Sequence, residues 1–145
     1  MPNSNPLTTY HFTVEWGGRR ISFTEVSGLD IETEVVHHRE GGSPEYNDKL
    51  MPGRIKYSNL VFKRGIIAGD NDFYQWINTI NLNTVERRDI TIRLLDESHE
   101  PIVTWRVKNA FPVKYTSPIL SATENNIAIE ILEIAHEGFN MEHEQ

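Results

Sequence analysis

The stretch from Pro52 to Ile80 constrains the fold most, because it holds an alternating strand, a glycine break and the chain's one convincing helix. Large apolar residues recur in the helix at i, i+3, i+4 and i+7, which places them on one face. They are Phe73, Trp76, Ile77 and Ile80. Asp70 is predicted to cap the helix, and Asp72 adds negative charge to its first turn. Burying these side chains contributes roughly 1.5–3 kcal/mol each, whereas ordering about ten backbone residues costs roughly 1–2 kcal/mol each. The helix must therefore pack against a larger element.

Apolar and polar residues alternate in most of the remaining chain, as is typical of half-buried strands. Gly17-Gly18 predicts a tight hairpin turn, and the segment 96–101 predicts a hairpin loop. In the last strand, Ile127–Ala135, the apolar set shifts faces before Leu132, and a bulge there would explain the shift. The other expected strands span residues 10–16, 21–26, 29–39, 55–64, 89–95 and 102–107, with a further extended piece from Phe111.

We therefore predict a mainly β fold, with two packed antiparallel sheets forming a partly open β-barrel and one short flanking helix at about residues 70–81. A chain of 145 residues suits a single domain, 1–145. Three segments lie outside the pattern: an arm at 1–9, a long loop at 40–53 and a polar tail at 138–145, which we expect to be loose unless a neighbour holds it.

The strand from Leu29 lacks the residues that block edge pairing, so either the 40–53 loop or another subunit covers it. The second option predicts an oligomer.

Charge and composition exclude several classes of protein. A net charge of −7 argues against binding the phosphate backbone of nucleic acid, which needs a basic surface. Cysteine is absent, so there is no disulfide framework and no thiolate site. No apolar run approaches the roughly 18 residues of a membrane span, and no signal-peptide pattern begins the chain. We expect the newly synthesised chain to be soluble and not to insert stably into a membrane.

Motifs that could carry chemistry fail on spacing. His136 begins an H-E-x-x-H-like run, but Asn140 stands at the second ligand position and the context is a strand end. His37 and His38 are neighbours on a strand, so they point to opposite faces. The run 70–72 resembles the start of a calcium loop but lacks the glycine and the distal glutamate. GGSPE around Ser43 lacks the last glycine of a nucleophile elbow. We predict no catalytic residue, no metal and no cofactor.

Basic pairs and tryptophans could mark a binding surface. The pairs Arg19-Arg20, Lys63-Arg64 and Arg87-Arg88 each lie at a strand end, where solvated termini are the favoured interpretation. Trp16, Trp76 and Trp105 could line a sugar platform, but their strand and helix positions favour the core.

A set of motifs runs in order along nearly the whole chain, and it resembles the inner tube proteins of contractile phage tails. The resemblance is strongest to extracellular phage-tail-like injection systems such as the antifeeding prophage, and it extends to Hcp-like proteins in fold. The motifs are TYHFTVEW, FTEVSGLDIETEVVHHREGG, KLMPGRIKYSNLVFKRGI, GDNDFYQWINTI, RRDITIRLLDE, TWRVKNAFPVKYTSP and ATENNIAIEILEIAHEG.

The resemblance implies a structural protein that forms hexameric rings, which stack into a rigid tube inside a contractile sheath. Implied partners are sheath, baseplate or spike and tube-terminating proteins, with protein cargo in the lumen. The tube would assemble in the cytoplasm of the producing bacterium and then belong to a released or envelope-associated particle. Within that picture the long loop and both termini are expected at ring contacts, with stacking assigned to Gly41, Gly42, Pro44, Tyr46, Met51 and Pro52.

One hypothesis concerns the tube lumen. If Glu32 and Glu34 line the bore, with Glu130 beside them, the ring repeats each carboxylate and gives a negative channel. The alternative is that these glutamates form an outer solvated face. Two other classes stay open for the whole protein: a monomeric β-sandwich binding module for a glycan or protein ligand, and a hydrolase with an unrecognised site.

Overall fold

The computed structural model describes residues 7, 11–17, 19–39, 41–42 and 49–144. Within them the chain forms ten strands and one helix. In chain order these are β1 (Phe12–Trp16), β2 (Arg19–Ile21), β3 (Glu25–Ser27), β4 (Ile31–His38), β5 (Lys49–Tyr57), β6 (Leu60–Gly65), α1 (Asp72–Asn81), β7 (Arg88–Leu95), β8 (Pro101–Thr116), β9 (Ile129–Ala135) and β10 (Phe139–His143). The prediction of a mainly β protein with one short helix is confirmed.

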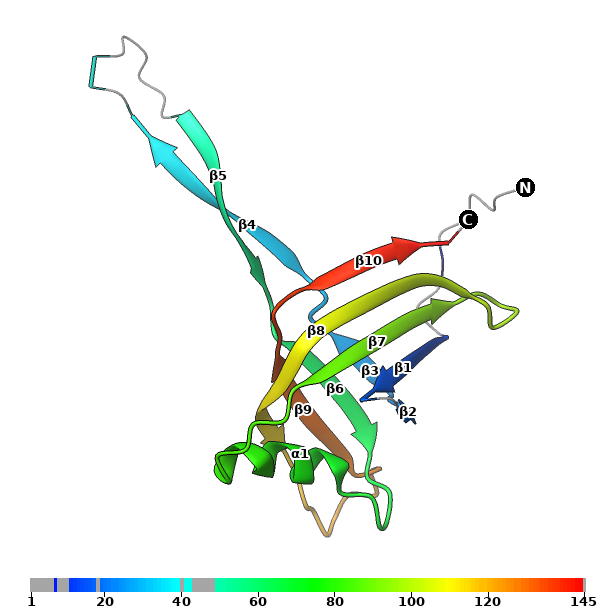
Figure 1. Cartoon of the computed structure of the whole chain (residues 1–145). Helices are drawn as coiled ribbons and strands as arrows, with labels where there is room; N and C mark the ends of the chain where they lie inside the picture. The colour runs from blue at the N-terminus through cyan, green and yellow to red at the C-terminus, as the bar shows by residue number, and fades with distance from the viewer. Residues whose placement is uncertain (1–6, 8–10, 18, 40, 43–48, 145) are drawn as a thin grey trace.

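Strand β8 joins the two layers of the body. Its first half pairs with β7 on one side and with β10 on the other, and its second half pairs with β9. The strand order is β2-β1-β7-β8-β9-β6-β3, with every printed pair antiparallel. The end strands β2 and β3 are close in sequence but do not pair with each other, so the barrel remains open. β4 and β5 form a separate two-stranded sheet that projects from the body (Figure 1).

Asn109 marks the point where β8 changes layer. The pairing of β7 with β8 skips register between Arg88 and Ile90, which leaves an extra residue in β8 opposite Asp89. Asn109 has a φ of 50°, a conformation that asparagine tolerates better than most residues. Its backbone N–H donates to Asp89 Oδ1 over 3.0 Å. This bulge bends the strand, as bulges commonly do. It explains why an asparagine begins the N-A-F-P motif.

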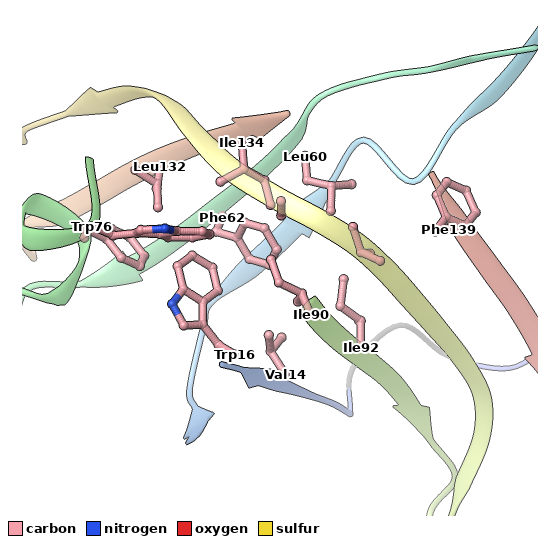
Figure 2. Packing of buried hydrophobic residues seen from close by; sticks show 13 residues of the cluster. Val14, Trp16, Leu60, Phe62, Trp76, Ile90, Ile92, Leu132, Ile134 and Phe139 are labelled. Atoms are coloured by element: carbon pink, nitrogen blue, oxygen red, sulfur yellow. The ribbon is translucent and has the colours of Figure 1, made fainter. Parts of the chain in front are cut away.

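The core lies between the two layers and is closed by α1. Trp16 from β1 and Trp76 from α1 meet edge to face with ring centroids 4.5 Å apart, and both are fully buried. Phe62 from β6 and Phe73 from α1 complete the aromatic cluster, with centroids 5.1 and 5.7 Å from that of Trp16. Figure 2 shows the aliphatic residues of the strands gathered around these rings. The helix thus buries Phe73 and Trp76 fully, while Ile77 and Ile80 are half-buried.

Two arginines fix the start of α1. Asn71 occupies the N-cap position without a side-chain hydrogen bond, so the predicted N-cap position is wrong by one residue. The predicted interaction is present, because Asp70 Oδ1 accepts from the backbone N–H of Asp72, the first residue of α1, over 3.1 Å. Arg64 donates to the Asp70 carboxylate over 3.2 and 3.3 Å, and Arg88 donates to Asp72 over 3.1 and 3.4 Å. For Arg64 and Arg88, the expectation of solvated strand ends is therefore wrong.

Two segments that were expected to be irregular are strands. The predicted loop at 40–53 ends early, because β5 begins at Lys49 and runs through Pro52 and Gly53. Proline fits there because, among the described residues, β5 pairs with β4 and with no other strand. The expectation of a loose tail is wrong for Phe139–His143, which pairs with β8 as β10. The expected arm at 1–9 lies outside the described residues except for Leu7.

The predicted bulge in the last strand is also wrong. β9 pairs with β6 in unbroken register from Ile129 to Ile134. Its buried face consists of Glu130, Leu132 and Ile134, in strict alternation. The irregularity lies in the partner strand β8, where Val113 is skipped between Pro112 and Lys114. The apparent shift of faces arose because a buried glutamate occupies a core-facing position.

Candidate functional site

The projecting sheet of β4 and β5, here called the ribbon, has two chemically different faces. The register pairs Ile31 with Tyr57, Thr33 with Ile55, Val35 with Pro52 and His37 with Leu50. Since paired residues share a face, these positions form one side of the ribbon, and that side carries no Asp, Glu, Lys or Arg. The opposite side carries the pairs Glu32 with Lys56, Val36 with Met51 and His38 with Lys49.

The apolar face of the ribbon is open to solvent. Ile31, Leu50 and Ile55 are 56%, 65% and 58% exposed, and Val35 is similarly exposed. An isolated two-stranded sheet is marginally stable in water, and a contiguous exposed apolar surface of this kind marks an interaction site. The ribbon is therefore suited to packing against another protein surface.

The charged face of the ribbon holds a solvent-exposed ion pair. Lys56 Nζ lies 2.7 Å from Glu34 Oε1. The hydrogen bond from Lys56 and its positive charge lower the pKa of Glu34 below the ordinary glutamate value, and the same pair raises the pKa of Lys56. Gly53 lies under this face, where an added Cβ would come within 3.2 Å of Glu34 Cβ. The two predicted lumen carboxylates Glu32 and Glu34 thus share one face, together with a lysine.

An aromatic cluster holds the root of the ribbon on the body. The ring of Tyr57 lies with its centroid 5.3 Å from that of Phe139 and 5.6 Å from that of His136. His136 Nδ1 accepts from the Gly138 N–H over 3.0 Å, which leaves Nε2 to donate to the Ser58 carbonyl over 2.9 Å. Tyr57 covers Gly138, whose φ is 126° and where a Cβ would lie 3.1 Å from the tyrosine ring. His136 therefore has a structural role in joining ribbon and body.

Three strands of the body present an edge without a partner among the described residues. β2 pairs only with β1, β3 only with β6, and β10 only with β8. Such edges expose unpaired backbone N–H and C=O groups, which are templates for pairing with another chain. The edges and the ribbon together leave both hydrogen-bonding and apolar surface available.

Glu130 lies elsewhere, in a buried ionic cluster. Its Oε1 accepts from Arg64 Nε over 2.6 Å and its Oε2 accepts from the Tyr115 hydroxyl over 2.8 Å. Arg64 and Glu130 are 2% and 4% exposed, and the guanidinium carbon of Arg64 lies 4.1 Å from the Phe73 ring centroid. Desolvation, followed by the bond to Glu130, raises the pKa of Tyr115. A carboxylate held in this way faces the interior of the subunit, so the expectation that Glu130 lines a channel is corrected.

Four of the six residues expected to stack rings are described by the structure, and they lie at or near the distal half of the ribbon. Met51 and Pro52 are exposed on β5, and Gly41 and Gly42 form an exposed turn. Pro44 and Tyr46 lie outside the described residues. The apolar face of the ribbon was not predicted as a whole from the sequence, although the alternation of Ile31, Thr33 and Val35 indicates its β4 half.

In the part of the chain that the structure describes, no group of three or more His, Asp or Glu side chains could hold a metal ion, and α1 is too short to cross a membrane. Trp16 and Trp76 are buried and Trp105 is half-buried, so they do not form a sugar platform. The mainly β fold, its open strand edges and the exposed apolar face of the ribbon are typical of a structural protein that contacts other chains.

Comparison with known proteins identifies the family. Residues 8–140 match the model of the T4-like virus tail tube protein gp19 family. The chain belongs to this family, and it is a structural tail tube protein. No protein in the curated collection of sequences matches it significantly.

Several solved structures share the fold of this chain. A chain in the cryo-EM structure of the anti-feeding prophage cap (AFP tube terminating cap) is 36% identical, with a TM-score of 0.90 over 99% of this chain and 95% of that chain. A chain of the PVC sheath-tube complex in the extended state, from an extracellular contractile injection system, is 37% identical, with a TM-score of 0.88 over 97% and 93%. Hcp1 from Flavobacterium johnsoniae shares the fold at 16% identity, with a TM-score of 0.63 over 92% and 95%. The predicted tail-tube and Hcp-like fold is confirmed.

Proposed function

We propose that this tail tube protein of contractile injection systems forms hexameric rings, and that the rings stack into the rigid inner tube of the particle. The observation that carries the proposal is the ribbon, a projecting two-stranded sheet whose apolar face is left open by the part of the chain that the structure describes. The open edges of β2, β3 and β10 support side-by-side closure of the ring, because joining sheets into a closed barrel removes their edges.

Stacking is assigned to the distal half of the ribbon. We place Gly41, Gly42, Met51 and Pro52 at the contact between rings, together with Pro44 and Tyr46 from the adjoining segment. The exposed position of β4 and β5 supports this assignment, since an element that projects from the body reaches a second ring without rearrangement of the core (Figure 1).

The charged face of the ribbon is assigned to the bore. If the apolar face packs on a neighbouring copy, the face with Glu32, Glu34 and Lys56 remains in water. A ring repeats these charges around the lumen, so that charged protein cargo is repelled from or attracted to the wall according to its sign. Reversing Glu32 and Glu34 to lysine should leave ring assembly intact and change cargo loading. Unchanged loading in intact tubes would place this face on the outside.

The proposed partners of the tube and its place in a particle are based on the related structures. The related PVC chain was solved in a sheath-tube complex and the related AFP chain in a tube terminating cap. We propose corresponding sheath, baseplate and terminator partners here, with assembly in the cytoplasm of the producing bacterium and a later place in a phage-tail-like particle. We assign no enzymatic activity to the chain.

Imaging and mass measurement of the purified protein test the proposal. Six copies of a 16.8 kDa chain give a ring of about 100 kDa, visible as hollow discs or stacked tubes by electron microscopy. A protein that stays monomeric at high concentration would instead favour the monomeric binding module.

A further inference from the structure

A second exposed apolar surface lies at the end of the body that is opposite to the ribbon. Ile119, Leu120 and Ile127 in the loop between β8 and β9 are 94%, 90% and 81% exposed. Ile66 and Ile67 in the loop after β6 are also exposed. We call these five residues the loop patch. Scattered exposed isoleucines are ordinary, but a contiguous group of them marks a contact surface.

The two loops are held together, so the patch is one surface. The backbone N–H of Ile66 donates to the Ala128 carbonyl over 2.9 Å, directly beyond the pairing of Gly65 with Ile129. The loop between β8 and β9 also forms an open groove of about 490 Å³, where Ile119, Leu120 and Ile127 line the wall together with Ser121, Glu124 and Asn126. Glu124 is the one charged residue in the segment 117–128. The groove can therefore receive an apolar surface on its Ile119, Leu120 and Ile127 side.

Strands β6 and β9 span the distance between the patch and the root of the ribbon. β6 begins three residues after Tyr57, the last residue of the ribbon, and ends at Gly65 beside the patch. β9 runs the other way, from Ile129 beside the patch to Ala135 beside His136 at the root. Figure 1 shows the same arrangement, with the ribbon and the two loops at opposite ends of the subunit.

We propose that the loop patch receives the apolar face of the ribbon from a second copy of this chain in the next ring. The inference rests on the proposed tube. Copies stacked along a tube axis repeat head to tail, so each contact between rings joins one end of a subunit to the opposite end of the next. Here those two ends carry the ribbon, whose apolar face has no Asp, Glu, Lys or Arg, and a groove with one charge. Each surface supplies the apolar cover that the other lacks.

Cysteine cross-linking tests the contact directly, because the chain has no cysteine of its own. The variant carrying Leu50→Cys and Leu120→Cys should, in assembled tubes, form disulfides between rings and give a ladder of covalent multimers on non-reducing gels. The matched control pairs Leu50→Cys with Val113→Cys, which is exposed on β8 and should give no ladder. Tubes that are intact by electron microscopy but yield no Leu50–Leu120 ladder, or that yield one equally with the control, would overturn the proposal.

A second variant separates the possible occupants of the patch. Ile119→Ser with Leu120→Ser changes two side chains that are at least 90% exposed, so the subunit should fold and form rings, while the yield of stacked tubes should fall at least tenfold. Val85→Ser with Val113→Ser, both exposed outside the patch, should stack as the unchanged protein does. Normal tubes from the patch variant would overturn the proposal, and loss of sheath binding by those tubes would assign the patch to the sheath. If the unchanged protein forms no tubes, the proposed function itself fails.

Discussion

Arg64 and Glu130, which are 66 residues apart in the sequence, form a buried ion pair between two strands, with Nε and Oε1 2.6 Å apart. Arg64 also contacts Asp70 ahead of α1 and the ring of Phe73 within it. The pair therefore joins β6, β9 and the helix at one point. Buried pairs of this kind cost desolvation when formed, but removing one partner leaves an uncompensated charge.

Glu130→Ala should destabilise the subunit by about 3 kcal/mol, the lower end of the range for breaking a buried pair, because Asp70 still neutralises Arg64. Urea unfolding of the dispersed subunit measures the change. The double variant Arg64→Met with Glu130→Leu should recover much of the loss, since well-packed apolar residues replace buried pairs at little cost. Glu133→Ala, at the neighbouring half-buried position of β9, is the control. Equal stability of Glu130→Ala and the unchanged protein would show that the carboxylate is solvated.

Tyr115 should make stability depend on alkaline pH. Burial and the hydrogen bond to Glu130 raise the pKa of its hydroxyl in the folded state, while the unfolded chain has the ordinary value of about 10. The stabilisation is complete below that ordinary value and is lost as the pH rises through the folded value, because the unfolded state releases the proton first. Thermal unfolding midpoints should therefore fall more steeply above about pH 10 in the unchanged protein than in Tyr115→Phe. Tyr74→Phe, on the exposed side of α1, should keep the steep fall, and equal slopes in all three proteins would contradict the prediction.

Gly28, in the V-S-G-L motif, should not tolerate the methyl group of an alanine. Gly28 has a φ of 97°, and a Cβ there would lie 2.1 Å from the Asn59 carbonyl oxygen, a backbone atom. Gly28→Ala should therefore prevent folding, seen as loss of soluble protein and of cooperative unfolding. Gly69→Ala is the matched control, because Gly69 has a φ of 83° with no atom within 4 Å of the added Cβ. It should cost only the backbone strain of about 1–2 kcal/mol. Soluble, stable Gly28→Ala would mean that β3 and the β5–β6 turn separate without penalty.

How far the sequence reveals this fold depends on the range of the interaction. Alternation of side chains predicts β1, β7 and the first half of β8, and helical spacing predicts α1, because each pattern is local. Nothing in the residues next to Glu130 predicts its pairing with Arg64. Side-chain alternation alone therefore assigns this glutamate to the solvent-exposed face of β9, and the apolar pattern of the strand then looks shifted by one residue. The same limit hides β10, whose polar residues lie on an edge and become a strand only through pairing with β8.

The candidate site was partly visible in the sequence. The unblocked strand from Leu29 predicts an open edge, and the β4 part of the ribbon follows from it. Pro52 and Gly53 made the partner strand resemble a loop, because proline and glycine are rare in central strands. They fit here since the ribbon has only two strands, and the register that separates its apolar and charged faces depends on a bulge between Thr33 and Val35.

Val35 and Val36 provide a matched test of the ribbon, because they are the same residue at adjacent positions on opposite faces. Val35 pairs with Pro52 on the apolar face and Val36 pairs with Met51 on the charged face, and both side chains are about half exposed. Val35→Asp should leave the subunit folded and abolish stacked tubes, since a contact that buries it would have to desolvate an unpaired carboxylate. Val36→Asp adds the same charge beside Met51, which we place at the contact between rings, so it should weaken stacking, but less than Val35→Asp does.

Sedimentation and electron microscopy of the two valine variants at equal concentration measure the difference, and circular dichroism confirms that each remains folded. Because either substitution introduces the same charge and the same loss of β propensity, a change in assembly that is equal in both would reflect the ribbon's own stability. Only a difference between them reports which face is covered. If Val36→Asp blocked stacking and Val35→Asp did not, the charged face would be the contact surface and the apolar face would be the one left in water.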